Sequence, residues 1–217
     1  MNAIIVSATL LLLVILIGML RARGRYKRNL VRLLDWEWNT WGGQLKQDGH
    51  LLIEGKKENE NPYPMKVNKY WQSVGENYTG LDDVAWSGAF VSYILKNAGA
   101  EGIEGSALHS DYIRKAVDNR KKGLLDSNYV AYRHFEKEAE VGDLVCYSRE
   151  AEIDLYDRTT PYLSHCDIVV KKNSNNVEVI GGNVSNSVTK KIVTTSDGKI
   201  LDLSNKWFAI IKNNQTF

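Results

Sequence analysis

The chain contains little cysteine: its 217 residues include two, Cys146 and Cys166. Two thiols cannot build the disulfide framework of a small secreted scaffold or the four-cysteine ligand set of a structural zinc site. They could form a single disulfide if their strands are neighbours and the protein works in an oxidising compartment. Because two small buried thiols are the commoner arrangement, we expect both to lie unpaired in the core.

Excess charge and metal-binding motifs are also missing. The net charge is +2, and lysine and arginine do not cluster with aromatic residues, so we do not expect nucleic-acid binding. The four histidines form neither an HExxH motif nor a paired His/Asp motif, so we predict no metal and no cofactor. The 43% hydrophobic and 25% charged content is typical of a folded domain, and the length suits one domain with a modest extension.

One long hydrophobic run is present at the N-terminus. Residues 3–20 carry no charge, and at about 1.5 Å per residue they could cross a bilayer as a transmembrane helix. Basic residues follow this run within residues 21–28 instead of preceding it, which argues against a cleavable signal and places the following domain in the cytoplasm of the producing cell. A helix inserted only in a recipient's membrane is the alternative. We divide the chain into this segment with its basic flank, 1–24, and a folded domain, 25–217.

Helical periodicity occurs in three places. Apolar residues recur every three or four positions over residues 30–41, which predicts an amphipathic helix ended by the glycine pair that follows. Residues 82–97 predict a buried helix, and residues 106–118 predict another. Residues 44–70 are polar and interrupted by glycine and proline, so we expect a loop there.

The second half of the chain changes to the period of β-strands. Short runs rich in β-branched or aromatic residues alternate with polar turns, at residues 142–148, 165–172, 176–182, 190–196 and 206–213. Helices followed by strands predict an α+β fold, in which an antiparallel β-sheet packs against one of the helices.

Three polar residues occur in the sequence order of a nucleophile, its base and the residue that orients the base. Ser87 opens the buried helix within WSGAFV, where free backbone N–H groups and the helix dipole would stabilise negative charge. His165 enters a strand within SHCDIVV, and Asn183 leaves the next strand within VIGGNVSNSV. The sequence therefore predicts a catalytic triad of Ser87, His165 and Asn183. Ser87 could instead be a helix N-cap.

Four further residues are candidates for the same site. Cys146 is an alternative nucleophile, because its strand would lie beside that of His165, although a small buried core residue is the simpler interpretation. Trp86, His109 and Asp167 are candidates to line the cleft. Asp167 shares a strand face with His165 and could orient its ring. His109 lies near a helix start, where a structural histidine is the commoner case.

These motifs resemble the CHAP and NlpC-type superfamily of papain-like cell-wall hydrolases, in which a motif such as WCAAFV opens the nucleophile helix. The resemblance covers about residues 70–211 and includes GDLVC, SHCDIVV and IGGNVSNSV. The chain is more similar to a bacterial branch of unknown-function domains that carry serine in that motif and a downstream H-x-x-Y, here His109 and Tyr112. That branch includes antibacterial effectors of type VI secretion.

The resemblance implies a papain-like fold and a peptidoglycan hydrolase, either an amidase or an endopeptidase. It also implies an antibacterial toxin that is membrane-associated through its N-terminal helix and delivered to the periplasm of a target cell. An immunity protein and a secretion chaperone would be its partners. Because serine replaces the motif's cysteine, two alternatives stay open: an inactive, membrane-anchored cell-wall-binding module, and an amide or ester hydrolase or acyltransferase that acts on another substrate.

Overall fold

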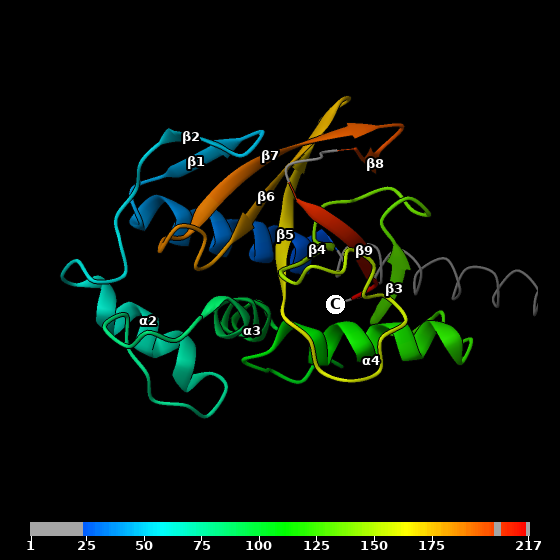
Figure 1. Ribbon diagram of the computed structural model, residues 1–217, viewed down its shortest axis with the longest axis horizontal. Helices are drawn as coiled ribbons and strands as arrows, with labels where there is room; N and C mark the ends of the chain where they lie inside the picture. Colours follow the sequence, from blue (N-terminus) through cyan, green and yellow to red (C-terminus); the bar gives the residue numbers. More distant parts are fainter. Residues whose placement is uncertain (1–23, 202–204, 216–217) are drawn as a thin grey trace, which may run out of the picture.

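The computed structural model describes residues 24–201 and 205–215, which form a mixed β-sheet with helices beside it (Figure 1). Eight strands follow one another in the order β2-β1-β7-β6-β5-β4-β9-β3, and β8 pairs with β7. The strands are β1 (Gln44–Gln47), β2 (His50–Ile53), β3 (Tyr129–Arg133), β4 (Leu144–Ser148), β5 (Ser164–Lys172), β6 (Asn176–Gly181), β7 (Thr189–Ser196), β8 (Lys199–Ile200) and β9 (Lys206–Asn213).

Strand β5 lies in the middle of the sheet and is covered on both faces. Its residues are buried from Ser164 to Val170, because the larger hydrophobic core covers one face and a smaller cluster covers the other. Ile168 belongs to the larger core, and its neighbour Val169 belongs to the smaller one, as the alternation of side chains along a strand requires. The five strands predicted from the second half of the chain are all present, within one or two residues of their predicted limits.

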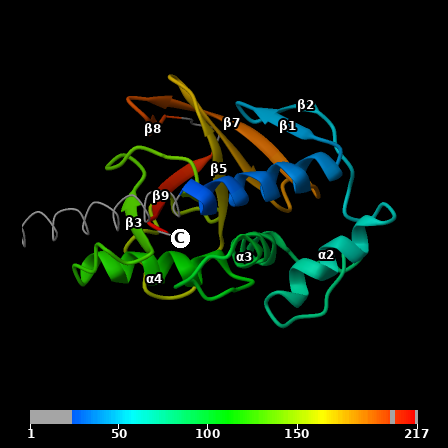
Figure 2. The same ribbon diagram turned by 180° about the vertical axis from the view of Figure 1, so that it is seen from behind.

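The helices pack on one side of the sheet. A helix of residues 24–40 crosses the sheet, as the view from behind shows (Figure 2), and positive φ angles at Gly42 and Gly43 follow its end. The other helices are α2 (Tyr63–Gln72), α3 (Ser87–Ala98) and α4 (His109–Lys121). Helix α3 contacts β5 and β6, so the predicted arrangement of the Ser87 helix against the sheet is confirmed.

The beginning of α3 differs from its predicted position. The sequence predicted a helix from residue 82, but α3 begins at Ser87. The carboxylate of Asp82 accepts hydrogen bonds from the backbone and the hydroxyl of Thr79, at 2.6 and 2.9 Å, and so forms a turn instead of a first helical turn. The helix then buries an apolar face that includes Phe90 and Ile94, and it ends at Gly99 in the left-handed conformation.

Three other expectations about the fold are wrong. The sheet is not wholly antiparallel, because β1 pairs with β7 in parallel. Residues 44–70 are not a loop, because they contain β1, β2 and most of α2. The papain-like fold with a transmembrane helix is not supported either: within residues 24–201 and 205–215, no helix is both long and apolar enough to cross a membrane. The hydrophobic run of residues 3–20 lies outside the described residues.

The two cysteines are joined in a disulfide, contrary to the expected pair of free thiols. Cys146 on β4 and Cys166 on β5 are directly opposite each other in the antiparallel ladder, with their Cα atoms 4.1 Å apart. Both are fully buried in the larger core. The disulfide therefore links the neighbouring strands β4 and β5 next to His165 and Asp167.

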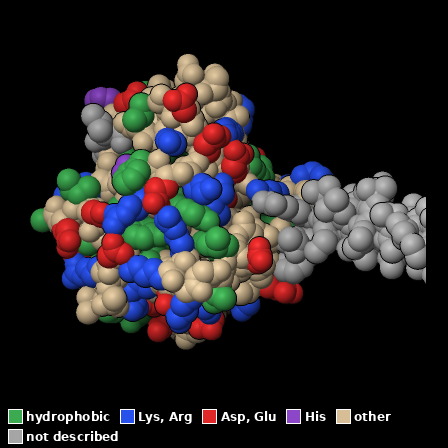
Figure 3. All heavy atoms as spheres, turned by 90° about the vertical axis from the view of Figure 1, so that its right-hand side faces the viewer, with side chains coloured by type: hydrophobic (Ala, Val, Ile, Leu, Met, Phe, Trp, Pro, Cys, Tyr) green, Lys and Arg blue, Asp and Glu red, His purple; other side chains and the backbone are tan. Residues whose placement is uncertain are grey.

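The surface around α4 and β3 carries charges of both signs. Figure 3 shows lysine and arginine side chains interspersed with aspartate and glutamate side chains on this side of the molecule. Arg120 pairs with Glu136 there, and Arg133 pairs with Asp157 at 2.6 Å. Such exposed pairs contribute little to stability individually, so the buried charges described below matter more.

Candidate active site

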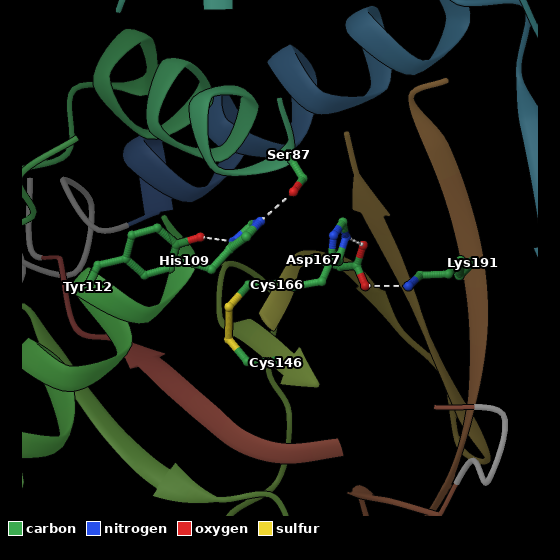
Figure 4. The surroundings of a disulfide bond; sticks show 8 residues. Ser87, His109, Tyr112, Cys146, Cys166, Asp167 and Lys191 are labelled. Carbon is green, nitrogen blue, oxygen red and sulfur yellow. Dashed lines mark hydrogen bonds and ion pairs between the residues drawn. A yellow bond between two sulfur atoms is a disulfide. The ribbon is translucent and has the colours of Figure 1, made fainter. Parts of the chain in front are cut away.

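Ser87 and His109 form the centre of the site. The Oγ atom of Ser87 lies 2.8 Å from Nε2 of His109, and the two side chains point toward each other from the starts of α3 and α4 (Figure 4). Ser87 is 3% exposed and His109 is 4% exposed. The residue at the N-cap position of α3 is Trp86, and no side chain caps this helix, so Ser87 does not serve as the N-cap.

Gly88 allows these two helix starts to approach each other. A Cβ atom at this position would lie 2.1 Å from the carbonyl oxygen of Ala107, which is closer than any real side chain tolerates. The segment that leads into α4 therefore packs directly against the first turn of α3. This contact brings His109, two residues after Ala107, within hydrogen-bonding distance of Ser87.

Tyr112 holds the other side of the His109 ring. Its hydroxyl forms a hydrogen bond with Nδ1 of His109, one helical turn away on α4. Burial raises the pKa of Tyr112 well above its ordinary value of 10, so the hydroxyl keeps its proton. A neutral imidazole has one donor and one acceptor nitrogen. When Nδ1 donates to Tyr112, Nε2 is free to accept the proton of Ser87.

His165 lies beside His109 but is held by other partners. The two imidazole rings are 5.1 Å apart between centroids. Nε2 of His165 lies 3.0 Å from Oδ1 of Asp167, and Nδ1 lies 3.0 Å from Nη2 of Arg149. Because arginine can only donate, Nδ1 accepts and Nε2 carries the proton that it donates to Asp167. Both ring nitrogens are therefore engaged, and neither bonds to Ser87.

Asp167 and Lys191 form a buried ion pair behind His165. Nζ of Lys191 lies 2.6 Å from Oδ2 of Asp167, and it also lies over the rings of Tyr147 and Trp207, at 4.6 and 5.4 Å from their centroids. Burial alone would raise the pKa of Asp167, but the charge of Lys191 and the His165 hydrogen bond hold it below its ordinary value. Asp167 is thus ionised at neutral pH and fully buried.

Both histidines are neutral at pH 7. Burial lowers the pKa of His109 well below its ordinary 6.5, with further lowering from His165 and Arg149, and the charge of Asp167 opposes this effect. Burial lowers the pKa of His165 to about 4, against the opposing effect of Asp167. A neutral His109 can accept a proton without first losing one, as a general base requires.

The low histidine pKa values predict a loss of stability in mild acid. An unfolded histidine titrates near pH 6.5, so between pH 6.5 and 4 the unfolded chain binds more protons than the folded one. The free energy of unfolding should therefore fall as the pH falls through this window, by roughly 3 kcal/mol for His165 alone, whose folded pKa is about 4. Urea unfolding at pH 7 and 4.5 measures this, with His165→Gln as the variant that should lose part of the pH dependence. A free energy that stays flat in the wild type would contradict the prediction.

Two glycines at the end of β6 and just after it permit the close packing around His165. A Cβ at Gly181 would lie 2.0 Å from Oδ1 of Asp167, and a Cβ at Gly182 would lie 2.5 Å from the ring of Phe90.

The next residue, Asn183, has a positive φ of 54°. Among the described residues its side chain makes no hydrogen bond with His165, whose nitrogens are occupied by Asp167 and Arg149. The structure therefore does not place Asn183 as the orienting residue.

Two other predicted site residues occupy different roles from those expected. Cys146 is bonded to Cys166, so it has no thiolate to act as the alternative nucleophile. Trp86 is 1% exposed, stacks on Trp41 and donates from Nε1 to Glu58, so it belongs to the core beneath Ser87 and does not line an open cleft.

Sequence reasoning placed His109 at the edge of the site, and the structure places it beside Ser87. The spacing of His109 and Tyr112 was the available signal, because residues three apart share a helix face. Lys191 and Arg149 were missed entirely. Arg149 reaches His165 from the loop that follows β4, Lys191 reaches Asp167 from β7, and the local sequence of neither residue shows a motif.

The site is therefore a buried pair of a serine hydroxyl and a neutral imidazole at the N-terminus of a buried helix. The chain belongs to the family described as "Uncharacterized protein conserved in bacteria (DUF2272)", whose pattern matches residues 40–212. This match includes Ser87, His109, Tyr112 and His165, so the whole site lies within the family's domain. No curated protein and no solved structure matches the chain.

Proposed function

We propose that this protein is a hydrolase in which Ser87 is the nucleophile and His109 is the general base. The observation that carries the proposal is the 2.8 Å distance between Ser87 Oγ and His109 Nε2. The neutral state of His109 and the acceptor that Tyr112 provides for Nδ1–H support the same roles.

The reaction would proceed in two steps. His109 takes the hydroxyl proton while Ser87 Oγ attacks the carbonyl carbon of an amide or ester, and the resulting imidazolium then gives that proton to the departing amine or alcohol. Water, deprotonated by the same histidine, then attacks the acyl-serine; the C–Oγ bond breaks, the acid leaves, and the imidazolium returns the proton to Ser87 Oγ.

The first turn of α3 provides donors for the oxyanion. The backbone ladder of α3 begins where Phe90 N donates to Trp86 O, at 2.9 Å. The N–H groups of Ser87, Gly88 and Ala89 precede it and have no partner within the helix. They lie on the nucleophile itself or next to it, so negative charge that develops on a substrate carbonyl oxygen would form beside these donors and the positive end of the helix dipole.

The proposed substrate is peptidoglycan, cut at an amide bond of the stem peptide or at its junction with the sugar. The support is the resemblance of WSGAFV and the downstream H-x-x-Y to the motifs of cell-wall hydrolases. Action as an antibacterial effector of type VI secretion, with an immunity protein and a secretion chaperone as partners, rests on that resemblance alone.

A second candidate function is a binding module without hydrolysis. The observation that favours it is burial: Ser87 and His109 expose 3% and 4% of their surface, so a substrate must displace neighbouring side chains to reach Oγ. Leu108, directly before His109, and Leu163, two residues before His165, are exposed apolar residues.

Purified peptidoglycan distinguishes the two candidates. We expect the wild-type protein to release soluble muropeptides, whose masses identify the bond that is cut, and Ser87→Ala to release none. Equal release by both proteins would contradict the role of Ser87. Binding of both proteins to the wall without release by either would establish the binding module.

A further inference from the structure

Arg149 is an exposed residue at the edge of the candidate site. It directly follows β4, and its backbone N–H donates to the carbonyl oxygen of Leu163 at 3.0 Å, which fixes the start of the loop between β4 and β5. Its side chain turns to His165, where Nη2 lies 3.0 Å from Nδ1. This contact uses one of the five N–H donors of the guanidinium group.

The charge of Arg149 has no carboxylate partner among residues 24–201 and 205–215. Each of the other arginines between residues 114 and 158 forms an ion pair with an aspartate or glutamate within 4.0 Å: Arg114, Arg120, Arg133 and Arg158. The carboxylates of Glu150, next to Arg149 in the sequence, and of Asp167 are bound by other residues: Glu150 by Arg158, and Asp167 by His165 and Lys191. The described part of the site therefore has an excess of positive charge at Arg149.

This guanidinium lies two side chains from the nucleophile. The path runs from Arg149 to the His165 ring at 3.0 Å, from there to the His109 ring at 5.1 Å between centroids, and from Nε2 of His109 to Ser87 Oγ at 2.8 Å. The positive charge of Arg149 also lowers the pKa of His109, although burial and the charge of His165 have larger effects. The guanidinium of Arg149 and the hydroxyl of Ser87 are therefore connected through the two imidazole rings.

We propose that Arg149 binds a carboxylate of the substrate, so that the substrates of Ser87 are amides or esters with a free carboxylate close to the bond that is cut. A guanidinium presents parallel N–H donors that match the two oxygens of a carboxylate, and the exposed side of Arg149 leaves such donors available. This inference rests on the proposed function of Ser87 and specifies its substrate class.

A matched pair of chromogenic esters tests the proposal: para-nitrophenyl hemisuccinate, which carries a carboxylate, and para-nitrophenyl butyrate, which does not. We expect wild-type kcat/KM to favour the hemisuccinate by about 10- to 100-fold, the range for a charge-assisted hydrogen bond. Arg149→Gln should remove this preference through a higher KM for the hemisuccinate, and Arg149→Lys should retain part of it. Arg158→Gln is the control, because it removes an equal charge from the same loop, where Arg158 pairs with Glu150.

The outcomes separate the two proposals. If Ser87→Ala hydrolyses both esters as fast as the wild type, the nucleophile assignment fails. If hydrolysis depends on Ser87 but the wild type shows no preference, or Arg149→Gln keeps it, the carboxylate proposal fails alone. Equal loss of activity on both esters in Arg149→Gln would also overturn it, because Arg149 would then act only by positioning His165. Peptidoglycan with amidated carboxyl groups provides the same comparison on a natural polymer, where intact wall should be the better substrate.

Discussion

Replacing His109 with alanine should lower the rate of Ser87-dependent hydrolysis by about 100- to 10,000-fold, the usual contribution of a general base. The reason is that Nε2 of His109 is the acceptor next to Ser87 Oγ, at 2.8 Å. His165→Gln should lower the rate far less, because a glutamine amide can still accept from Arg149 and donate to Asp167. Initial rates with para-nitrophenyl butyrate measure both variants, with thermal unfolding to confirm that each is folded.

The comparison decides which histidine is the base. Sequence order pointed to His165, and the geometry points to His109. Full loss in His165→Gln together with near-normal activity in His109→Ala would restore the first assignment. Tyr112→Phe provides an intermediate case, because it removes the acceptor for Nδ1–H and leaves the ring in place. We expect a smaller loss in this variant than in His109→Ala.

Replacing Lys191 with methionine should destabilise the fold by about 3–5 kcal/mol at pH 7, the usual cost of removing one partner of a buried ion pair. Asp167 would remain fully buried and ionised, with the His165 hydrogen bond as its remaining support. Lys171→Met is the matched control, because Lys171 is 61% exposed and pairs with Glu178 at the surface. Its cost should stay below about 1 kcal/mol. Urea unfolding at pH 7 measures both.

A double variant separates charge from packing. Asp167→Asn combined with Lys191→Met removes both charges, and the amide oxygen of asparagine can still accept the proton of His165 Nε2. Most of the lost stability should return, because no buried charge remains unpaired. If the double variant is as unstable as Lys191→Met alone, the packing of Lys191 against Tyr147 and Trp207 would account for the effect, and not the ion pair.

The sequence predicted those parts of the fold that bury a regular pattern. Apolar residues recur at every second position in strand β5 and every three or four positions in helix α3. Both elements lie where these patterns placed them, apart from the late start of α3. Strand β2 gave no such signal, because all four of its residues are exposed at the sheet edge. The parallel pairing of β1 with β7 joins segments more than 140 residues apart and is set by tertiary packing, which local patterns do not contain.

The site was predictable only in part for a similar reason. Ser87 was identified by the motif WSGAFV, which is a local property. The choice between His109 and His165 was not local, because both lie next to each other in space and only their hydrogen-bond partners distinguish them. Arg149, which contacts His165, depends on the loop that follows β4, and Lys191, which pairs with Asp167, depends on the pairing of strands.

The glycine in WSGAFV has a consequence for how the motif varies. An alanine in place of Gly88 would bring its methyl group into collision with the carbonyl oxygen of Ala107. An alanine there would therefore prevent the close packing that places His109 beside Ser87 at the start of α3. Homologous chains that keep glycine here should therefore also keep H-x-x-Y about twenty residues downstream, the spacing set here by Ser87 and His109.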